Sequence, residues 1–441
     1  MLHRRLTGPW LGVLAALAVL TANAQTPALN SAVNAQIDRA YPALQALYED
    51  IHSHPEIAFE ELRTAARLAS EMRALGFSVT EGVGKTGLVA IYENGAGPTV
   101  MVRTELDALP MEEKTGLPYA SRAKAMSNGR ESFVAHSCGH DVHMASWVGT
   151  ARTMVALKDR WRGRLMFIAQ PAEEILQGAH AMVSDGLFTR FAKPDVALAI
   201  HTTGEAAHGR VQYRAGPAMS AADTFEITFK GRGGHGSAPH NAIDPIVIAA
   251  RFVTEVQTVI SREKDPREFG VVTVGAFQAG TVANIIPDQA VLRGTLRSYA
   301  PEVRLLLRDG VRRTAAAVAS LSGAPAPEVN IIEGVGSVIN DEGVIQRVDA
   351  ALKSALGADQ VDIAKPQTPS EDFSIYATQG VPSLTMRIGV AAPEAIAAAA
   401  QPGGKPLANN HSPFFAPVPE PSIKTGIKVT SAALLALLGK R

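Results

Sequence analysis

Short apolar runs alternate with helical patterns through the first half of the chain. The apolar parts of PTVMVRTELDALP, RGRLMFIAQPAEE and PDVALAIHTT are each typical of a short, buried strand. Residues 141–157, between the first two runs, have helical periodicity, and so do residues 31–75, where Leu44, Leu47 and Ile51 share one face. Because strands that alternate with helices usually form a parallel sheet, this pattern predicts an α/β domain.

A different order of elements begins near Ala222. Phe225, Ile227 and Phe229 alternate along a strand that ends in KGRGGHGS. The elements that follow are a helix over about 243–261, strands near 270–279 and 289–298, a helix over about 301–321 and a strand in PEVNIIEG. This β-α-β-β-α-β order predicts a self-contained α+β unit of the ferredoxin-like kind.

The ferredoxin-like unit interrupts the α/β domain, whose pattern resumes near Gly334. We therefore expect four segments, which are a leader over 1–24, the first part of the α/β domain over 25–220, the inserted unit over 221–333, and the second part over 334–441. A chain of 441 residues also exceeds what one hydrophobic core usually supports, which favours two domains.

The first 24 residues have the layout of a cleaved secretory signal peptide. Two arginines precede an apolar run over 11–20, and residues 22–24 read A-N-A, a typical cleavage site. The alternative is a membrane anchor, but this run is too short to span a bilayer. The sequence predicts export, to the periplasm in preference to the medium, and a mature chain that does not enter the membrane.

Charge and cysteine content narrow the possible partners and chemistry. The chain has 42 Lys plus Arg and 42 Asp plus Glu, so its formal net charge is zero and nothing indicates a nucleic-acid partner. Cys138 is the only cysteine and cannot form an internal disulfide. It is therefore either a buried filler or a chemically active residue.

Acidic residues and a histidine follow the three predicted strands of the α/β domain. Glu105 and Asp107 come after the first strand, Glu173 and Glu174 after the second, and His201 at the end of the third. Because the carboxyl ends of parallel strands meet at one edge of a sheet, we expect these side chains to lie together.

The segment HSCGHDVH fits the same edge, since Cys138 and His140 stand just before the helix predicted from Asp141. A helix N-terminus favours a thiolate, and Gly139 lets the backbone turn so that sulfur and imidazole point the same way. Carboxylates, imidazoles and one thiolate together suit zinc or a similar divalent ion. The alternative is that Cys138 is a nucleophile, but this leaves Glu173, Glu174 and His201 without a role.

Glu173 and Glu174 allow a division of roles. One carboxylate can bind a metal while its neighbour takes a proton from the activated water and passes it to a leaving amine. This is the chemistry of metal-assisted amide hydrolysis. The structural alternative is that both acids serve a helix dipole.

The motifs RTELDALP, HSCGHDVH, QPAEE, IHTT, GRGGHGSAPH, NIIPD, GTLRS, SEDF and NNHSPFF occur together, in this order. In this the chain resembles the dinuclear metallo-amidohydrolases and peptidases that include hippurate hydrolase, indoleacetyl-amino-acid hydrolases, aminoacylase and the glutamate carboxypeptidases. HSCGHD and QPAEE are specific for the hippurate-hydrolase-like branch, which uses a cysteine ligand. The resemblance covers essentially the whole mature chain, and it implies a zinc-peptidase-like catalytic domain with an inserted lid and dimerisation domain.

The resemblance also implies roles for residues of the α/β domain. Glu173 would be the general base and then acid, and Asp107 would orient a ligand. Glu105 stands where this branch usually has Asp, so its role stays open, as do those of Glu371 and Asp372 in SEDF. Two divalent ions, zinc or manganese, would be held by five ligands: Cys138, His140, Glu174, His201 and His411.

In the inserted unit, the resemblance implies that His235 polarises the scissile carbonyl, often from the partner subunit of a homodimer. Asn284 and Arg297 would hold the free carboxylate of the substrate, for which the planar guanidinium is well suited. From the residues alone, a strand-end Asn and a solvated strand Arg are more often structural.

Together these observations predict an exported, two-metal amidohydrolase that cleaves N-acyl amino acids into a free amino acid and a carboxylic acid. A dipeptidase or metallocarboxypeptidase on the same scaffold is the first alternative. A periplasmic metal- or ligand-binding protein without turnover is the second, and the presence of Glu173 beside a full ligand set argues against it.

Overall fold

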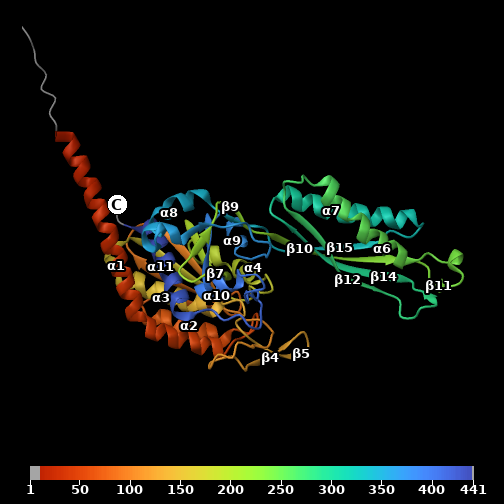
Figure 1. The fold of residues 1–441 in the computed structure, drawn as a ribbon, viewed down its shortest axis with the longest axis horizontal. Coiled ribbons are helices and arrows are strands. Elements are labelled where there is room, and N and C mark those ends of the chain that lie inside the picture. The colour runs from red at the N-terminus through yellow and green to blue at the C-terminus, as the bar shows by residue number, and fades with distance from the viewer. Residues whose placement is uncertain (1–9, 440–441) are drawn as a thin grey trace, which may run out of the picture. The chain divides into compact units, whose positions relative to one another are not determined.

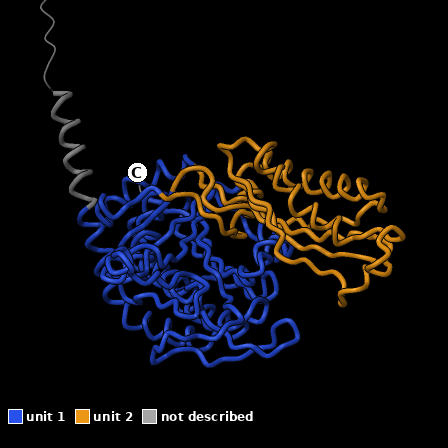
Figure 2. The backbone as a smooth tube through the Cα atoms, turned by 45° about the vertical axis from the view of Figure 1, so that its right-hand side comes forward, with its two compact units in different colours: residues 1–213, 342–363, 381–441 blue, residues 214–341, 364–380 orange. Residues whose placement is uncertain are grey.

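The computed structural model describes residues 10–439, which form two compact units (Figure 2). Unit 1 contains the chain up to Tyr213 together with 342–363 and the part from Val381 onwards, and unit 2 contains 214–341 and 364–380. These bounds differ from the expected limits of the inserted segment, because strands on either side of that segment pair with each other. Residues 1–9 of the expected signal peptide lie outside the described residues, and the remainder falls in the first helix.

Unit 1, which contains the strand labelled β7 in Figure 1, is built on an eight-stranded sheet in the order β1-β2-β6-β3-β7-β18-β8-β17. The neighbours β6, β3, β7 and β18 are parallel to one another. On one side of them β2 pairs antiparallel with β6, and β1 pairs antiparallel with β2. On the other side β8 pairs antiparallel with β18. The predicted α/β architecture with a mostly parallel sheet is confirmed. The strands are β1 (Ser78–Val83), β2 (Gly87–Asn94), β3 (Thr99–Glu105), β6 (Gly163–Gln170), β7 (Val196–Ala207), β8 (Val211–Tyr213), β17 (Val361–Ile363) and β18 (Ser383–Ala391).

Helices cover this sheet in two layers. Helices α2, α3, α8 and α11 pack on the strands, and α1 packs on α3, α8 and α11. Their apolar faces form one core with the strands, and the predicted face of Leu44, Leu47 and Ile51 lies within it. The helices of unit 1 are α1 (Trp10–Ser53), α2 (Leu62–Ala74), α3 (His140–Ala156), α4 (Gly178–Ser184), α5 (Leu187–Arg190), α8 (Glu342–Leu356), α10 (Pro393–Ala399) and α11 (Pro419–Leu438), and a hairpin of β4 (Lys124–Ser127) and β5 (Arg130–Phe133) is attached.

Two predicted elements of unit 1 have different limits in the structure. The helical segment over 31–75 is interrupted between α1 and α2, where Pro55 and the positive φ of Phe59 (63°) are incompatible with a continuous helix. The third strand does not end at His201 but continues to Ala207, because β18 pairs with it up to Thr203 and, after a register shift, again at Ala207.

Unit 2 has the predicted ferredoxin-like order. Its four-stranded sheet, β12-β14-β10-β15, is antiparallel throughout, and α6 and α7 bury their apolar faces against it. A two-stranded ribbon of β9 and β16 pairs the two stretches that flank the segment 221–333. The elements are β9 (Gly216–Met219), β10 (Ala221–Lys230), β11 (Gly234–His235), α6 (Pro245–Glu255), β12 (Gly270–Ala279), β13 (Ile285–Ile286), β14 (Gln289–Ser298), α7 (Pro301–Leu321), β15 (Glu328–Glu333), β16 (Val338–Asn340) and α9 (Ser374–Thr378).

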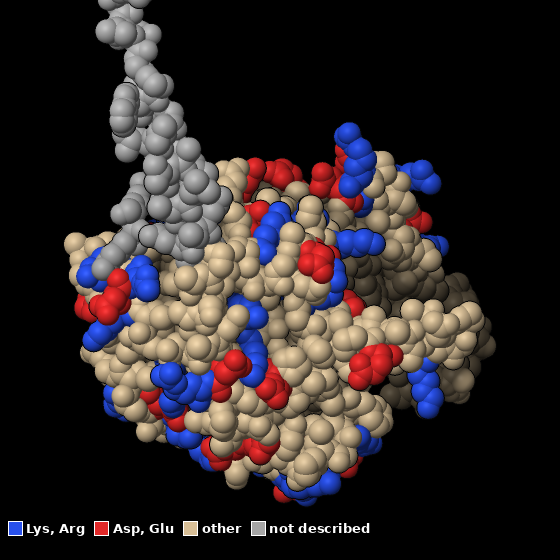
Figure 3. All heavy atoms as spheres, turned by 60° about the vertical axis from the view of Figure 1, so that its left-hand side comes forward, with Lys and Arg blue, Asp and Glu red and all other residues tan. Residues whose placement is uncertain are grey.

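Two surface properties bear on partners. Within residues 27–439, no helix is long and apolar enough to cross a membrane. On the face drawn in Figure 3, basic and acidic side chains are interspersed and do not gather by sign, as the balanced composition leads one to expect.

Candidate metal centre

Six of the sequence-predicted residues meet at the carboxyl end of the parallel strands in unit 1. Their ligand atoms form overlapping groups within which all atoms lie within 4.8 Å of one another. Three of these groups are Cys138 with His140 and His201, Cys138 with Glu174 and His411, and His140 with Glu173 and Glu174. The predicted convergence at this edge of the sheet is thus found.

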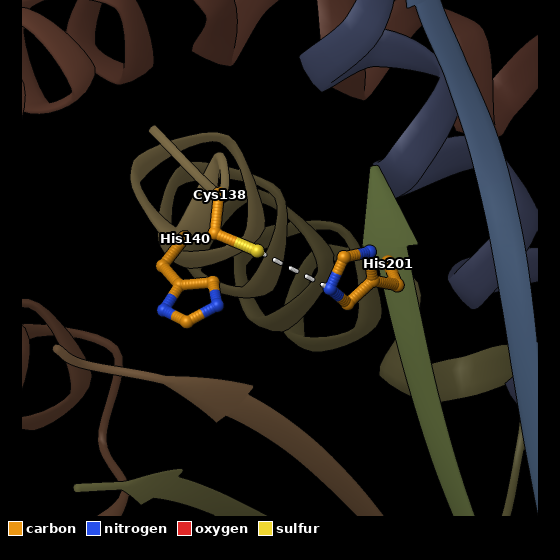
Figure 4. Close-up of side chains that lie close together, drawn as sticks. All are labelled: Cys138, His140 and His201. Atoms are coloured by element: carbon orange, nitrogen blue, oxygen red, sulfur yellow. Dashed lines mark hydrogen bonds between the residues drawn. The ribbon is translucent and has the colours of Figure 1, made fainter. Parts of the chain in front are cut away.

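The sulfur of Cys138 points towards the imidazole of His201, which projects from β7 (Figure 4). The distance from Cys138 Sγ to His201 Nε2 is 3.6 Å. Gly139 lies between this cysteine and α3 with a φ of +83°, and a Cβ built there would lie 2.6 Å from Thr202 Oγ1. The turn that presents Cys138 and His140 together therefore requires glycine, as the sequence indicated.

A hydrogen bond to the backbone of Asp107 orients the ring of His140. Its Nδ1 lies 2.7 Å from the backbone oxygen of Asp107, to which it donates, so the lone pair is on Nε2. This Nε2 is buried without a hydrogen-bond partner in the described part of the chain, and it lies 3.8 Å from Glu173 Oε2 and 3.9 Å from Glu174 Oε1. A buried acceptor facing carboxylates is costly unless a cation lies between them, so this donor set fits a metal ion.

Asp107 fixes the turn that carries the two glutamates. Its Oδ1 accepts the backbone N–H of Glu173 at 3.0 Å, and its Oδ2 accepts that of Glu174 at 2.9 Å. Burial and the nearby charge of Glu174 raise the pKa of Asp107, while the two N–H donors oppose this rise. The aspartate orients its neighbours, which is the kind of role the resemblance implied.

His411 approaches Glu174 from the C-terminal part of the chain. Its Nε2 lies 3.3 Å from Glu174 Oε2, and its side chain is 56% exposed. The residue has a positive φ of 65° and its N–H donates to the backbone oxygen of Ser137 at 2.7 Å. A non-glycine residue in this conformation is uncommon, so the surrounding contacts hold it there.

Three ligand-bearing segments are tied together at the carbonyl of Cys138. Thr202, which follows His201, donates its hydroxyl to this oxygen at 2.7 Å. Asn410, which precedes His411, donates its amide to the same oxygen at 2.9 Å and also bonds the Thr202 hydroxyl at 3.1 Å. The backbone around Cys138, His201 and His411 is therefore fixed independently of their side chains.

His143 and Arg103 belong to the site's surroundings and were missed by the sequence reasoning. His143 Nδ1 lies 2.9 Å from Glu105 Oε2, and its Nε2 accepts the backbone N–H of Thr202 at 2.8 Å. The other carboxylate oxygen of Glu105 accepts from Arg103. The signal for His143 was its place three residues after His140, on the same face of α3.

The helix start alone does not produce a thiolate at Cys138. Burial, followed by the charges of Glu174 and Glu173, raises the pKa of this thiol well above its ordinary value. Burial likewise lowers the pKa of His140. The carboxylates of Glu173 and Glu174 therefore lie close to a thiol and a neutral imidazole, with no positive charge from either. A divalent ion would supply the positive charge that stabilises these carboxylates and a thiolate.

The other candidate residues lie in unit 2, in two places. His235 in β11 pairs with Ile285 in β13, next to the exposed Asn284. The ring Nδ1 of His235 accepts the N–H of Ser237 at 3.1 Å. Arg297 lies near the far end of β14, partly buried, and donates to the backbone oxygen of Leu296 at 3.0 Å. The structure brings His235 and Asn284 together but not Arg297.

Glu371 and Asp372 are buried in unit 2, just before α9. Glu371 Oε1 accepts the backbone N–H of Phe373 at 3.0 Å, which stabilises the start of that helix.

Comparison with known proteins agrees with this geometry. The chain is 35% identical to an N-acetyl-L-cysteine deacetylase of Bacillus subtilis over 330 residues, 74% of this chain and 75% of that protein. It is 34% identical to the hippurate hydrolase of Campylobacter jejuni over 336 residues, with coverages of 75% and 84%. It is 35% identical to thermostable carboxypeptidase 2 of Saccharolobus solfataricus over 344 residues, with coverages of 77% and 84%.

A solved structure has the same fold. The YXEP protein of Bacillus subtilis, described as a dinuclear metal binding peptidase, matches with a TM-score of 0.74 and 27% sequence identity, over 92% of this chain and 99% of that one. The sequence model of peptidase family M20/M25/M40 matches residues 101–436, which include every residue of the candidate metal centre. The chain therefore belongs to peptidase family M20/M25/M40.

Proposed function

We propose that this protein is a metal-dependent amidohydrolase that cleaves N-acyl amino acids into a carboxylic acid and a free amino acid. One observation carries the proposal: Glu173 lies beside Glu174 in the turn that Asp107 fixes, with its Oε2 3.8 Å from His140 Nε2. A carboxylate held at this position can take a proton from water and return it to the leaving amine. The deacetylase and hydrolase names among the relatives support this reaction.

Two divalent ions fit the ligands of unit 1, which are Cys138, His140, Glu174, His201 and His411. When bound, they would lower the pKa of water towards neutrality and polarise the scissile carbonyl. The chain's own contribution is to orient these side chains. The backbone oxygen of Asp107 orients His140. The carbonyl of Cys138, which accepts hydrogen bonds from Thr202 and Asn410, holds the segments that carry His201 and His411. A thiolate among the ligands favours zinc, with manganese as the alternative.

The inserted unit suggests how the substrate is held. His235 and Asn284 lie at one end of the unit 2 sheet, whereas Arg297 is the ninth residue of the ten in β14, about 27 Å along that strand. One small substrate cannot reach both ends within one chain. We infer a homodimer in which His235 and Asn284 come from one subunit and Arg297 from the other.

The leader over 1–24 supports export, and we place the mature protein in the periplasm in preference to the medium. The mature chain would act on small molecules, without a nucleic-acid or membrane partner. Cleavage of dipeptides or of C-terminal residues is the second candidate function, and the carboxypeptidase among the relatives favours it. A binding protein without turnover would not require Glu173.

A substrate panel with one variant tests the proposal. N-acetyl and N-benzoyl amino acids are compared with dipeptides, and the release of free amino acid is measured for the wild type and for Glu173→Gln. We expect the wild type to prefer N-acyl amino acids and the variant to lose at least about 100-fold in kcat with its metal content unchanged. Activity of Glu173→Gln near that of the wild type would contradict the general-base role, and a preference for dipeptides would favour the second candidate.

A further inference from the structure

We infer that Glu61 is a positioning residue for the turn that carries Glu173 and Glu174. The inference rests on the proposed roles of these two glutamates, but it concerns a residue outside the segment 101–436 that the family model matches. Glu61 lies at the start of α2, more than one hundred residues before the turn that it contacts.

The contact is direct and buried. The Glu61 side chain has no exposed surface, and its Oε1 accepts the backbone N–H of Ala172 at 2.8 Å. Its other carboxylate oxygen accepts the hydroxyl of Thr86, a buried residue between β1 and β2. Both oxygens are therefore engaged, and the carboxylate cannot rotate without breaking one of these bonds.

Three consecutive backbone N–H groups of the turn thus end on two buried carboxylates. Ala172 donates to Glu61, while Glu173 and Glu174 donate to Asp107. Asp107 follows β3 and Glu61 begins α2, so the turn is held from two different elements. Neither carboxylate alone fixes all three peptide groups.

The backbone of this turn needs such support. Ala172 has a φ of +50°, a conformation that residues other than glycine rarely adopt. Its carbonyl accepts the N–H groups of Gln177 and Gly178 at 3.2 and 3.1 Å. A Cβ built on Gly178 would lie 1.5 Å from the oxygen of Pro171, so the two limbs of the turn are in close contact. A peptide group in this position cannot turn to find another acceptor.

Replacing Glu61 by alanine would leave the buried N–H of Ala172 without its acceptor. The turn would relax towards an ordinary φ at Ala172, and the next two residues would move with it. Because Glu173 and Glu174 are those two residues, both kcat and metal affinity are expected to fall. Loss of a group that orients ligands typically costs about 10- to 100-fold in one or both quantities.

The experiment compares three variants of the full-length chain. Glu61→Ala removes the acceptor. Glu61→Gln keeps an oxygen for Ala172 and offers an amide to Thr86, whose hydroxyl can accept. Glu56→Ala is the matched control, because Glu56 also holds the start of α2, by accepting the N–H groups of Arg63 and Thr64 at 3.0 and 2.8 Å, without contacting the turn. The readouts are kcat and KM for an N-acyl amino acid, and the Zn²⁺ affinity by calorimetry after the protein has been freed of metal by a chelator.

Glu61→Ala should lower kcat and Zn²⁺ affinity by at least about tenfold with KM within about threefold, and Glu61→Gln should restore both to near wild type. Glu56→Ala should lower only the unfolding temperature. If Glu61→Ala does not fold, Thr86→Val, which frees the carboxylate, should give a smaller loss in the same two quantities. Unchanged kcat and Zn²⁺ affinity in Glu61→Ala or in Thr86→Val, with only a lower unfolding temperature, would overturn the inference. A wild type that binds Zn²⁺ but hydrolyses no N-acyl amino acid would instead contradict the proposed substrate, while the affinity measurement would still test Glu61.

Discussion

Glu105, the last residue of β3, has a role that the sequence leaves open and that its surroundings in the structure explain. It is fully buried and bridges Arg103 and His143. Burial raises the pKa of Glu105, but the guanidinium of Arg103 and the imidazole of His143 outweigh it and hold the pKa below its ordinary value. The carboxylate is therefore ionised, and it fixes His143, whose Nε2 accepts the N–H of Thr202 next to His201.

Glu105→Gln should destabilise the protein, because it replaces the carboxylate that pairs with the buried Arg103 and His143 by a neutral amide. Removing one partner of a buried ion pair typically costs about 3–5 kcal/mol. The free energy of unfolding, measured by urea denaturation, checks this. Glu105→Asp keeps the charge but shortens the reach, so a smaller loss is expected. Equal stability of Glu105→Gln and the wild type would mean that Arg103 finds compensation elsewhere.

At this scale the sequence predicted the residues that carry chemistry better than those that support them. Cys138, His140 and Glu174 could be predicted because they stand beside strand ends and a helix start. Arg103 could not, because it lies inside a strand that reads as apolar, and its partner is set by the pleat of the sheet. Glu61 could not either, because its contact with Ala172 depends on how α2 packs within unit 1.

The elements α1 and α3 are joined by a buried ionic cluster. His52, in the last turn of α1, lies 2.6 Å from Asp141 at the start of α3 and 3.2 Å from Glu113. Burial lowers the pKa of His52, but its bonds to the two carboxylates prevail and raise the pKa to about 10. The imidazolium therefore connects α1 to Asp141, the residue next to the proposed metal ligand His140.

This cluster makes stability depend on pH. The folded-state pKa of His52 lies above the unfolded value of 6.5, so its contribution is complete below about pH 6.5 and is lost as the pH rises towards about 10. Urea unfolding from pH 6 to 10 should show this decline for the wild type and a flatter profile for His52→Gln. The control is His54→Gln, because His54 is largely exposed and lacks the two carboxylates. Parallel profiles for His52→Gln and the wild type would refute the cluster's role.

Regular elements with local patterns were predicted well, and those defined by distant partners were not. The limits of β12, β14 and α7 coincide with the predicted ranges, since alternation and helical periodicity are local properties. The length of β7 depends on β18, which lies far along the chain, so no local pattern could indicate it.

Over the whole molecule, all the proposed metal ligands belong to unit 1, although they come from four separate stretches of the chain. Unit 1 is therefore expected to gain stability from the metal. Removal of metal by a chelator should lower the unfolding temperature, since a ligand at a hundredfold excess over its Kd stabilises the folded state by about 2.7 kcal/mol. Differential scanning calorimetry before and after chelation measures the change, and added Zn²⁺ should reverse it. An unfolding temperature that does not respond to chelation would argue against a metal at this site.

A variant of unit 2, His235→Ala, should lose activity without losing metal or thermal stability. His235→Ala is expected to lower kcat by about 100-fold, because it removes a donor proposed to act on the scissile carbonyl. Its metal content and unfolding temperature should stay at the wild-type values, since His235 is exposed and lies outside unit 1. Elemental analysis alongside kinetics separates the two effects, and a loss of metal in this variant would contradict the assignment.

The position of β18 also determines the order in which the molecule can be completed during synthesis. This strand lies between β7 and β8, yet it is translated after the whole segment 214–341. The sheet of unit 2 pairs only strands between 221 and 333, so it can form on a nascent chain while the sheet of unit 1 still lacks a central member. His411 leaves the ribosome later still. The proposed metal site can therefore be completed only late, and a translation product that stops before β18 has neither a finished sheet nor all of the proposed ligands.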